Sequence, residues 1–318
     1  MSEGVDKVMA IQPVISYPGA KWKAWQHIKP LIPRDITDWR EPFLGGASMS
    51  LLMAEDTEFN IKRMQVGDLA PEIWAFWQGC KESAPEVVER AKEIFTSNCP
   101  TQLDLQRMDV SDSEYQKTYD KAIEEGREFW KWAKEVDCTA LSLVERAART
   151  FLVNRISFSG MGDSGSISRD QFADFRFEKL NRILAAQPLL KKMDIRNCSF
   201  EETMSDVSDT DTFIFLDPPY FNQMKSGLYG RGGDTHKGFP HLGFAELTKS
   251  LKCRWLVTYD DSIRVRRLFK GKEFFIKPFI IPYTMAGVTA EDALAGEELF
   301  ISNYDIMDQC SDGLFDEL

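Results

Sequence analysis

The residues best suited to chemistry are Asp217, Pro218, Pro219 and Tyr220, which directly follow an apolar run at 213–216. A carboxylate at the carboxyl end of a buried strand lies where open α/β sheets bind ligands. Consecutive prolines stiffen the turn and remove two N–H donors, so they present bare carbonyl oxygens. The carboxylate and a carbonyl could hold an amino group while the tyrosine ring stacks on a flat base. The alternative is a surface turn in which Asp217 caps a helix and Tyr220 belongs to the core.

A second pattern suited to ligand binding is the glycine turn at 43–47, which precedes a predicted helix near Ser48. Glycine lets the backbone approach a ligand closely, and a helix start offers N–H groups. Asp68 follows Gly46 by 22 residues, at the end of a predicted strand. Nucleotide-binding folds place an acid on ribose hydroxyls at a spacing of roughly 20 residues. A plain tight turn at 43–47 and a helix N-cap at Asp68 are the alternatives.

The composition is that of an ordinary globular chain. Its 318 residues are 43% hydrophobic and 28% charged, with 20 glycines and 14 prolines. These values exclude disordered, collagen-like and disulfide-framework proteins. The net charge of −11 argues against a polyanionic partner. However, residues 291–318 hold nine acids and no base, so residues 1–290 sum to only −2, which is compatible with a nucleic-acid partner.

The cysteines and histidines do not have the spacing of a metal site. The six cysteines form no CxxC pair and the three histidines show no i, i+4 spacing, so no metal is expected. We find neither a signal-peptide pattern nor an apolar run approaching the ~20 residues of a membrane span. We therefore expect a soluble, cytoplasmic protein with reduced thiols and no membrane partner.

A sheet is needed to position the candidate residues. Short apolar runs predict strands at 64–68, 213–216, 255–259 and 299–304. From about 83 to 157 the amphipathic periodicity instead predicts helices, the first beginning at a capping box on Ser83. The fold class is therefore α/β, with a sheet domain interrupted by a helical insertion.

Six segments, taken in order, resemble a known family. They are Tyr17–Lys21, Glu41–Ser48, Asp68, Asp217–Tyr220, Thr258–Ser262 and Glu297–Tyr304. Their joint order resembles the Dam-like, alpha-type DNA adenine-N6 methyltransferases over roughly residues 13–305. The resemblance implies a Rossmann-like, S-adenosylmethionine-dependent methyltransferase domain at 1–78 and 190–318. It also implies a helical DNA-recognition domain inserted at 79–189.

By the same resemblance, the cofactor S-adenosylmethionine is held around the glycine turn and the acids. The implied cofactor-binding residues are Tyr17, Lys21, Phe43, Gly45, Gly46, Ala47, Asp68, Phe200 and Asp217. Tyr17 stands where the family more often has Trp, and Ala20 and Ala47 stand where Gly is typical. Phe200 falls where the family contacts the adenine ring, with a plain core position as the alternative.

The DNA contacts are implied by a segment that resembles the family's NR…(F/Y)NG pattern, with Ser159 at the usual Asn. The expected DNA-binding residues are Arg146, Arg149, Asn154, Arg155, Lys225 and Arg231. The basic, glycine-rich segment 223–241 is expected to be a loop that orders on DNA, with a plain surface loop as the alternative. The stretch found in GATC-reading members is missing, so the sequence assigns no recognition site.

The implied reaction is methyl transfer to N6 of an adenine flipped out of double-stranded DNA, with Asp217, Pro218, Pro219 and Tyr220 catalytic. Hydrogen bonds from N6 to Asp217 and to the Pro218 carbonyl would localise the nitrogen lone pair and aim it at the methyl group. One alternative is a methyltransferase that acts on RNA or on a protein glutamine, and another is a DNA-binding homologue without activity. We expect a monomer or a weak dimer.

Overall fold

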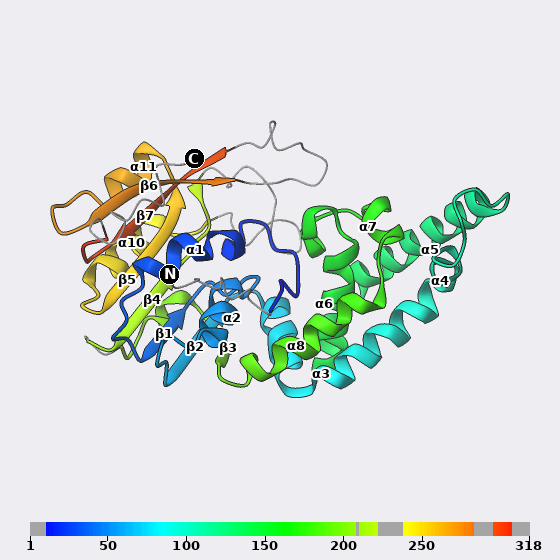
Figure 1. The fold of residues 1–318 in the computed structure, drawn as a ribbon, viewed down its shortest axis with the longest axis horizontal. Coiled ribbons are helices and arrows are strands. Elements are labelled where there is room, and N and C mark those ends of the chain that lie inside the picture. The colour runs from blue at the N-terminus through cyan, green and yellow to red at the C-terminus, as the bar shows by residue number, and fades with distance from the viewer. Residues whose placement is uncertain (1–10, 208–209, 222–237, 283–294, 307–318) are drawn as a thin grey trace, which may run out of the picture.

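The structure is a computed structural model that describes residues 11–207, 210–221, 238–282 and 295–306. A seven-stranded sheet packed with helices lies beside a largely helical region (Figure 1). The strands are β1 Asp38–Glu41, β2 Arg63–Asp68, β3 Asp194–Asn197, β4 Thr212–Leu216, β5 Arg254–Asp260, β6 Phe275–Pro282 and β7 Ala295–Ser302. Their order is β3-β2-β1-β4-β5-β7-β6, which confirms the α/β class predicted from the sequence.

The first five strands in this order are parallel, so their carboxyl ends share one edge of the sheet. Strand β7 is antiparallel to both β5 and β6. The chain moves outward from β1 to β3 and then returns to place β4 against the other side of β1. Open α/β sheets form their binding crevice outside the carboxyl ends at such a reversal. The carboxyl ends of β1 and β4 are therefore where this sheet is expected to hold a ligand.

Strand β4 lies in the middle of the sheet, and all of its residues are buried. Phe213 and Phe215 belong to one hydrophobic cluster, whereas Ile214 and Leu216 belong to another. Side chains of a strand alternate between the two faces, so each face of the sheet has its own core. The predicted strand at 213–216 is confirmed, as are the predicted strands around 64–68, 255–259 and 299–304.

Strand β1 is not predicted by the sequence pattern because it consists of Asp, Trp, Arg and Glu. All four residues are nevertheless buried. The fully buried Arg40 pairs with Asp38 at 2.9 Å and donates hydrogen bonds to three backbone carbonyls within 203–206. A buried charge is tolerated when it is paired and hydrogen-bonded in this way. The pattern also does not predict β3 and β6.

Short helices complete the sheet domain. They are η1 Lys21–Ala24, α1 Trp25–Ile28, η2 Lys29–Leu31, α2 Ser48–Glu55, α9 Phe200–Thr203, α10 His241–Ser250 and α11 Ile263–Leu268. Helix α2 starts immediately after the glycine turn, as predicted.

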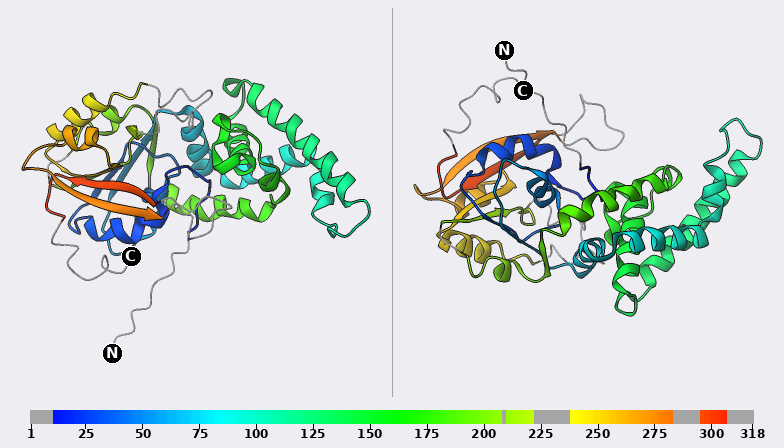
Figure 2. Two further views of the ribbon diagram at one scale, coloured as in Figure 1. Left: turned by 90° about the horizontal axis from the view of Figure 1, so that it is seen from above. Right: turned by 60° about the horizontal axis from the view of Figure 1, so that its bottom comes forward.

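The chain between β2 and β3 is helical, and its far end projects away from the sheet (Figure 2). Its elements are α3 Pro71–Asn98, α4 Pro100–Leu105, α5 Tyr115–Glu135, η3 Cys138–Ala140, α6 Leu143–Ile156, η4 Phe158–Gly160, η5 Gly162–Ser164, α7 Arg169–Ala173, η6 Phe177–Leu180 and α8 Asn181–Leu190. We call the part from residue 79 to residue 189 the insert. The expected domain boundary after residue 78 falls inside α3, and the division into domains stays a prediction.

Helix α3 consists of two helical segments that meet at a kink, and the second segment begins after Ser83, as predicted. The backbone of Ser83 has φ −141° and ψ 50°, while helix continues on both sides. Pro85 lacks the N–H that an unbroken helix needs. The serine and proline therefore mark the start of the second helical segment of α3.

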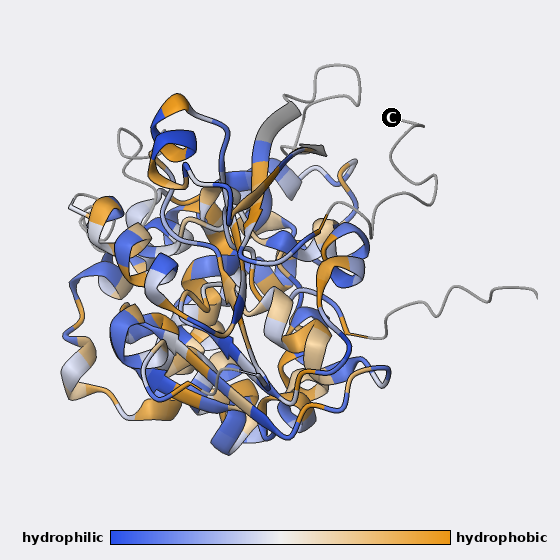
Figure 3. Cartoon of the chain, turned by 90° about the vertical axis from the view of Figure 1, so that its left-hand side faces the viewer, coloured by the Kyte–Doolittle hydropathy of each residue, from blue (hydrophilic) through white to orange (hydrophobic). Residues whose placement is uncertain are grey.

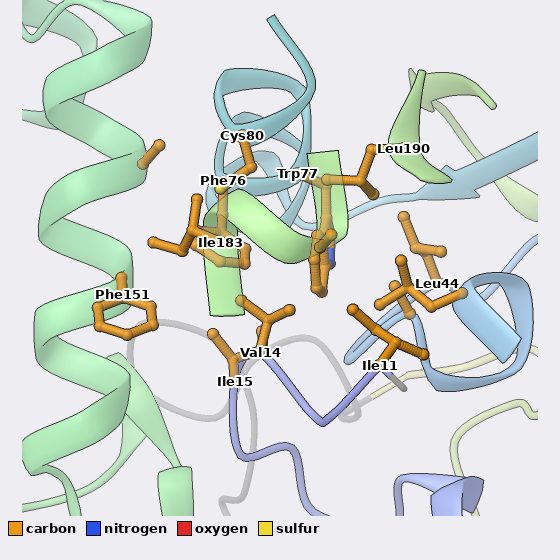
Figure 4. Close-up of a cluster of buried hydrophobic side chains, with 14 of the residues drawn as sticks. Ile11, Val14, Ile15, Leu44, Phe76, Trp77, Cys80, Phe151, Ile183 and Leu190 are labelled. Carbon is orange, nitrogen blue, oxygen red and sulfur yellow. The ribbon is translucent and has the colours of Figure 1, made fainter. Parts of the chain in front are cut away.

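Residues 11–17, which we call the N-terminal strap, run between the sheet domain and the insert. Its buried aliphatic side chains pack among residues of both parts (Figure 4). The backbone N–H of Ile11 donates to Glu55 at 3.0 Å. The backbone of Ser16 donates to Asn154 Oδ1 at 2.9 Å and accepts from Asn154 Nδ2 at 2.6 Å. The strap therefore joins α2 of the sheet domain to α6 of the insert.

Hydrophobic and hydrophilic residues are interleaved along the helices and strands on the sheet-domain side (Figure 3). Within the described ranges, no helix has both the length and the apolar character needed to cross a bilayer. Within the same ranges, no three His, Cys, Asp or Glu side chains gather in a way that could hold a metal ion.

Candidate active site

A cavity of about 920 Å³ opens at the carboxyl edge of the sheet and faces the insert. Ligand pockets span roughly 300–1,000 Å³, so this one is at the large end. Most of the predicted catalytic and cofactor-binding residues line it: Tyr17, Lys21, Phe43, Gly45, Gly46, Asp68, Phe200, Asp217, Pro218, Pro219 and Tyr220. Parts of α6 and residues 160–163 supply the wall contributed by the insert. One cavity thus unites segments that lie more than 200 residues apart in the sequence.

Asp217 follows β4 and has both carboxylate oxygens hydrogen-bonded. Lys21 Nζ donates to Oδ1 at 2.9 Å and to Oδ2 at 3.0 Å. The Thr258 hydroxyl on β5 donates to Oδ1 at 2.7 Å, and the Tyr220 hydroxyl lies 3.1 Å from the same oxygen. The donors therefore crowd Oδ1, whereas Oδ2 accepts from Lys21. Asp217 keeps 21% of its side-chain surface exposed.

Lys21 is a buried cation at the centre of this group, with 2% of its side chain exposed. Its Nζ donates to the Gly19 carbonyl at 2.8 Å, lies 3.8 Å from Glu298 Oε2 and sits 5.0 Å from the centre of the Tyr220 ring. Burial alone would lower the pKa of Lys21, but the neighbouring Asp217 and Glu298 carboxylates outweigh it and raise the pKa above its usual value. The amine is therefore held in its charged form.

Tyr220 is fixed by contacts to two further strands. Its hydroxyl donates to Glu298 Oε2 at 2.9 Å, and its ring packs 5.7 Å from the ring of Tyr259. The backbone N–H of Phe221 donates to Asp260 Oδ1 at 3.0 Å. The stiff proline turn is thus anchored at both of its ends, and Tyr220 both lines the cavity and belongs to the core.

The glycine turn is shaped by what packs against it. Gly45 has φ +45°, donates its N–H to Asp68 at 2.8 Å and accepts from Trp77 Nε1 at 2.8 Å. A Cβ on Gly45 would lie 2.7 Å from the Tyr17 ring, and one on Gly46 would lie 2.8 Å from Tyr17 Cβ. Both glycines are therefore required by the close approach of Tyr17.

Ala47 lies behind the cavity wall, fully buried, at the start of α2. Its backbone is left-handed, with φ 52° and ψ 22°. This conformation costs a residue with a Cβ about 1–2 kcal/mol, which glycine avoids. The left-handed backbone at this position explains why glycine is typical here in the family that the sequence resembles.

Asp68 holds the turn rather than a helix. Its Oδ2 accepts from Gly45 and its Oδ1 accepts from the backbone N–H of Ala70, both at 2.8 Å. The N-cap position of α3 belongs to Ala70, so the alternative of an N-cap at Asp68 is wrong. Burial raises the pKa of Asp68 to about 6, although the two N–H groups act in the opposite direction.

Aromatic rings and one acid complete the wall. Phe43 and Phe200 stack with 5.7 Å between ring centres, and both line the cavity, so Phe200 is a packing residue and a cavity residue at once. Glu41 at the end of β1 also lines the cavity and accepts hydrogen bonds from the Ser50 N–H and hydroxyl. Burial, reinforced by Asp217 and Asp68 and opposed by Ser50, raises the pKa of Glu41 to about 8.

Two of the residues expected to contact DNA are occupied inside the protein. Arg149 is 1% exposed, pairs with Asp163 at 2.6 Å and donates to the Ala133 carbonyl at 2.7 Å. The Asn154 amide is used by Ser16 and by the Gly160 carbonyl. Both residues also line the cavity, and their contact with DNA stays a prediction.

The remaining DNA-binding predictions have different outcomes. Arg146 donates to Glu72 at 3.0 Å and to the Pro71 carbonyl, which ties α6 to the start of α3. Arg155 is half-buried and donates to the Ser16 hydroxyl at 3.1 Å. Lys225 and Arg231 lie outside the described residues, as does most of the predicted loop at 223–241.

Thr258, Glu298 and Glu41 are the site residues that sequence reasoning did not single out. They occur only inside longer segments that resemble the family, and no local pattern marks them. Thr258 and Glu298 lie 41 and 81 residues beyond Asp217, and the sheet order β4-β5-β7 brings them beside it. Strand ends that follow a predicted catalytic strand are therefore the places to search.

The sheet, with its antiparallel β7 and its cavity at the reversal between β1 and β4, is consistent with a methyltransferase fold that uses S-adenosylmethionine. Residues 17–279 match the family model of D12 class N6 adenine-specific DNA methyltransferases, and the chain belongs to this family. This confirms the resemblance found in the sequence. The protein is thus an adenine-specific DNA methyltransferase, and the family implies S-adenosylmethionine as methyl donor and DNA as substrate.

Two curated relatives have similar sequences. The Type II methyltransferase M1.LlaDCHI of Lactococcus lactis subsp. cremoris is 21% identical over 269 residues, which cover 82% of this chain and 76% of the relative. The Type II methyltransferase M.CviBI of Paramecium bursaria Chlorella virus NC1A is 21% identical over 271 residues, which cover 82% of this chain and 87% of the relative. The similarity therefore spans both the sheet domain and the insert.

Proposed function

We propose that the cavity binds S-adenosylmethionine beside the glycine turn and receives at Asp217 the N6 amino group of an adenine flipped out of double-stranded DNA. The observation that carries this proposal is that the glycine turn and the Asp217–Tyr220 turn line one cavity at the sheet reversal. A base inside a duplex cannot reach such a site, so it must leave the stack at a cost of a few kcal/mol.

The residues present fit the cofactor. The glycine turn leaves backbone without side chains at the wall, and Asp68 next to it has acceptor capacity for ribose hydroxyls beyond its two N–H partners. Phe43 and Phe200 offer aromatic surface for an adenine ring. The shape of the turn depends on Tyr17, Gly46 and Ala47. Lys21 would act through its contact with Asp217. When bound, S-adenosylmethionine supplies a methyl group on a positively charged sulfur.

One carboxylate oxygen of Asp217 can accept a further hydrogen bond from the substrate amine. Its Oδ1 already accepts from Lys21 and Thr258 and lies 3.1 Å from the Tyr220 hydroxyl, whereas Oδ2 accepts from Lys21 alone among the described residues. A carboxylate oxygen has two lone-pair sites, so Oδ2 can accept an N6 hydrogen. The Pro218 carbonyl beside it would accept the other, and Pro219 keeps the turn rigid. Tyr220 would offer its cavity-facing surface to the base.

The charges also set where the proton goes. Because Lys21 is held as an ammonium, it cannot accept a proton from N6. As N6 gains the methyl group it becomes positive, and Asp217 Oδ2 is the acceptor that can stabilise this charge, take up the proton that N6 loses and release it to solvent. Lys21 would act as a positioning residue that fixes the Asp217 carboxylate.

A methyl-transfer assay tests the proposal. The enzyme is incubated with tritiated S-adenosylmethionine and unmethylated DNA, RNA or protein, and the labelled product is hydrolysed to nucleosides. We expect N6-methyladenine in DNA, reduced by about 10³-fold or more in Asp217→Ala. Binding of the cofactor should be largely retained.

Asp261→Ala is the matched control, because Asp261 pairs with Arg266 away from the cavity lining. It should transfer methyl groups at the normal rate. Asp217→Asn, which keeps the size of the side chain, separates loss of the carboxylate from loss of the fold. Label found only in RNA or protein, or a normal rate in both Asp217 variants, would refute the proposal.

We further propose that the chain protects DNA as the modification part of a restriction-modification system, because both relatives carry the Type II name. A DNA substrate also favours a cytoplasmic location. The expected state is a monomer or a weak dimer, which sedimentation equilibrium would measure.

A further inference from the structure

Four basic side chains gather on one face of the insert, and we call them the cationic patch. They are Arg155 at the end of α6, Arg176 before η6, Lys179 in η6 and Arg182 in α8. All four are half-buried. They act on one another electrostatically: Arg182 acts on Arg155, and the three arginines act on Lys179.

The patch is not neutralised by ion pairs. Among the described residues, no carboxylate oxygen lies within 4.0 Å of any of the four cationic groups. Their hydrogen bonds go to neutral oxygens instead: Arg155 to the Ser16 hydroxyl, Arg182 to the Pro13 carbonyl, Arg176 to two carbonyls of 173–175 and Lys179 to the Asp174 carbonyl. The Asp174 carboxylate is the acid that favours the charge on Lys179.

Five other arginines of the insert behave differently, whereas Arg169, like the patch, has no carboxylate within 4.0 Å among the described residues. The arginines at 90, 107, 127, 146 and 149 each lie within 4.0 Å of a carboxylate. This contrast matters because the chain as a whole is acidic and offers many partners. The patch is therefore a group of four neighbouring bases that act on one another and have no carboxylate within 4.0 Å among the described residues, unlike most arginines of the insert.

Holding these charges together costs free energy. Burial and the neighbouring Arg182 lower the pKa of Arg155 to about 10. Burial and the three arginines lower the pKa of Lys179, although Asp174 opposes them. A polyanion laid across the patch would remove this repulsion, because each phosphate brings one negative charge.

The patch borders the cavity through the N-terminal strap. Arg155 and Arg182 both donate to strap residues, at 3.1 Å and 2.9 Å. The last residue of the strap, Tyr17, lines the cavity. A duplex that delivers a base into the cavity would thus pass close to these cations.

We propose that Arg155, Arg176, Lys179 and Arg182 bind the phosphodiester backbone of the duplex whose adenine enters the cavity. This inference rests on the proposed function and assigns the backbone contact to a surface of which the sequence analysis named only Arg155. Phosphate contacts fix position and orientation without reading sequence. The patch should therefore contribute equally to DNA of any sequence.

The test measures the affinity of the intact protein for a fluorescent duplex of random sequence over a series of salt concentrations. Each lost phosphate contact lowers the slope of log affinity against log salt by about 0.9. The double variant Arg176→Gln, Lys179→Gln should therefore lower the slope by about 2 and weaken binding on the order of 50-fold at about 0.1 M salt. The Michaelis constant for DNA should rise by more than the turnover number falls.

The matched control is Arg107→Gln, Lys117→Gln, which removes the same charge from two exposed, ion-paired bases of the insert. Its slope should equal that of the wild type. A second variant, Arg176→Lys with Lys179→Arg, keeps the charges while changing the backbone hydrogen bonds, and should keep the slope. Normal cofactor binding would confirm that each variant is folded.

Equal slopes in the wild type and the double variant overturn the inference. If methyl transfer to DNA proceeds while the slopes are equal, the proposed function survives and only the patch assignment fails. If the wild type transfers no methyl group to DNA yet the double variant lowers the slope, the patch binds DNA and the proposed function fails. The inference also fails if the folded charge-keeping variant, Arg176→Lys with Lys179→Arg, lowers the salt slope as much as the double variant does. The patch would then support the local structure and not bind phosphate through its charge.

Discussion

At the Asp217 end of the cavity, charged groups hold the side chains in place. The buried Lys21 ammonium lies between the Asp217 and Glu298 carboxylates, and the hydroxyls of Thr258 and Tyr220 lie beside them. At the Gly45 end, position is fixed by shape, because a left-handed turn lies under an aromatic ring that leaves no space for a side chain. The first end can hold a hydrogen atom and a developing charge. The second fits the shape of a ligand, with Asp68 as its acceptor, so substitutions at the two ends should have different effects.

The largest effect is expected from removing the cation at the charged end. Lys21→Met leaves Asp217 and the buried Glu298 without their positive partner. Breaking a buried pair in this way costs about 3 kcal/mol of unfolding free energy, and methyl transfer should fall by about 10²-fold or more. Urea unfolding and the transfer assay measure the two effects.

Lys29→Met is the control for that change, since Lys29 pairs with Asp56 and Glu58 and keeps 22% of its side chain exposed. It should cost less than about 1 kcal/mol and leave activity intact. If Lys21→Met and Lys29→Met behaved alike, the charged end would not depend on its cation.

An intermediate effect is expected at the shaped end. Gly45→Ala combines a positive φ with a Cβ 2.7 Å from the Tyr17 ring. Gly162→Ala has a similar φ of +53° but meets no atom within 4 Å. Gly45→Ala should therefore cost about 1–3 kcal/mol more than Gly162→Ala, the usual penalty of overpacking. It should also weaken cofactor binding, measured by calorimetry.

Truncating the ring should relieve that clash. In the double variant Gly45→Ala, Tyr17→Leu, part of the lost cofactor affinity and stability should return. Equal penalties in Gly45→Ala and Gly162→Ala would show that backbone strain alone, and not the Tyr17 contact, shapes this end.

An effect that appears only as a change of stability with pH is expected from Glu41, which lies between the two ends. Its pKa is about 8 in the folded protein, compared with an ordinary value of 4.5. The folded state thus holds this proton more tightly than the unfolded state, so stability is lost as pH rises from 4.5 toward 8. Unfolding by urea at about pH 5 and about pH 8 should show a larger decline for the wild type than for Glu41→Gln. Identical declines would mean that Glu41 is already ionised at low pH.

The turn at Asp217–Tyr220, which we propose to be catalytic, could be found in the sequence because its cues are local. A fully apolar strand, an acid and two prolines follow one another at 213–219. The hydrophobic pattern and the residue types are therefore enough to predict this turn. The glycine turn and Asp68 were found through their spacing and their resemblance to the family. In each case the structure places the residue at the carboxyl edge, where parallel strands must end.

The rest depends on contacts that no local pattern carries. Strand β1 escaped prediction because Arg40 is neutralised by Asp38 and by backbone carbonyls, which hides a charged residue in the core. Arg149 has the same residue type as a DNA contact but is buried against Asp163. The packing of the insert decides whether an arginine pairs with a carboxylate inside the protein. Arg149 does so with Asp163, whereas Arg155 donates to the neutral Ser16 hydroxyl.

The N-terminal strap has a consequence for dissecting the molecule. Asn154 of α6 supplies both hydrogen bonds to the backbone of Ser16, and Gly160 packs so close to that residue that an added Cβ would lie 2.4 Å away. Five residues later the chain reaches Lys21. The helical region is therefore not a detachable module: a shortened chain without it would lose the hydrogen bonds that hold Ser16, five residues before the buried Lys21.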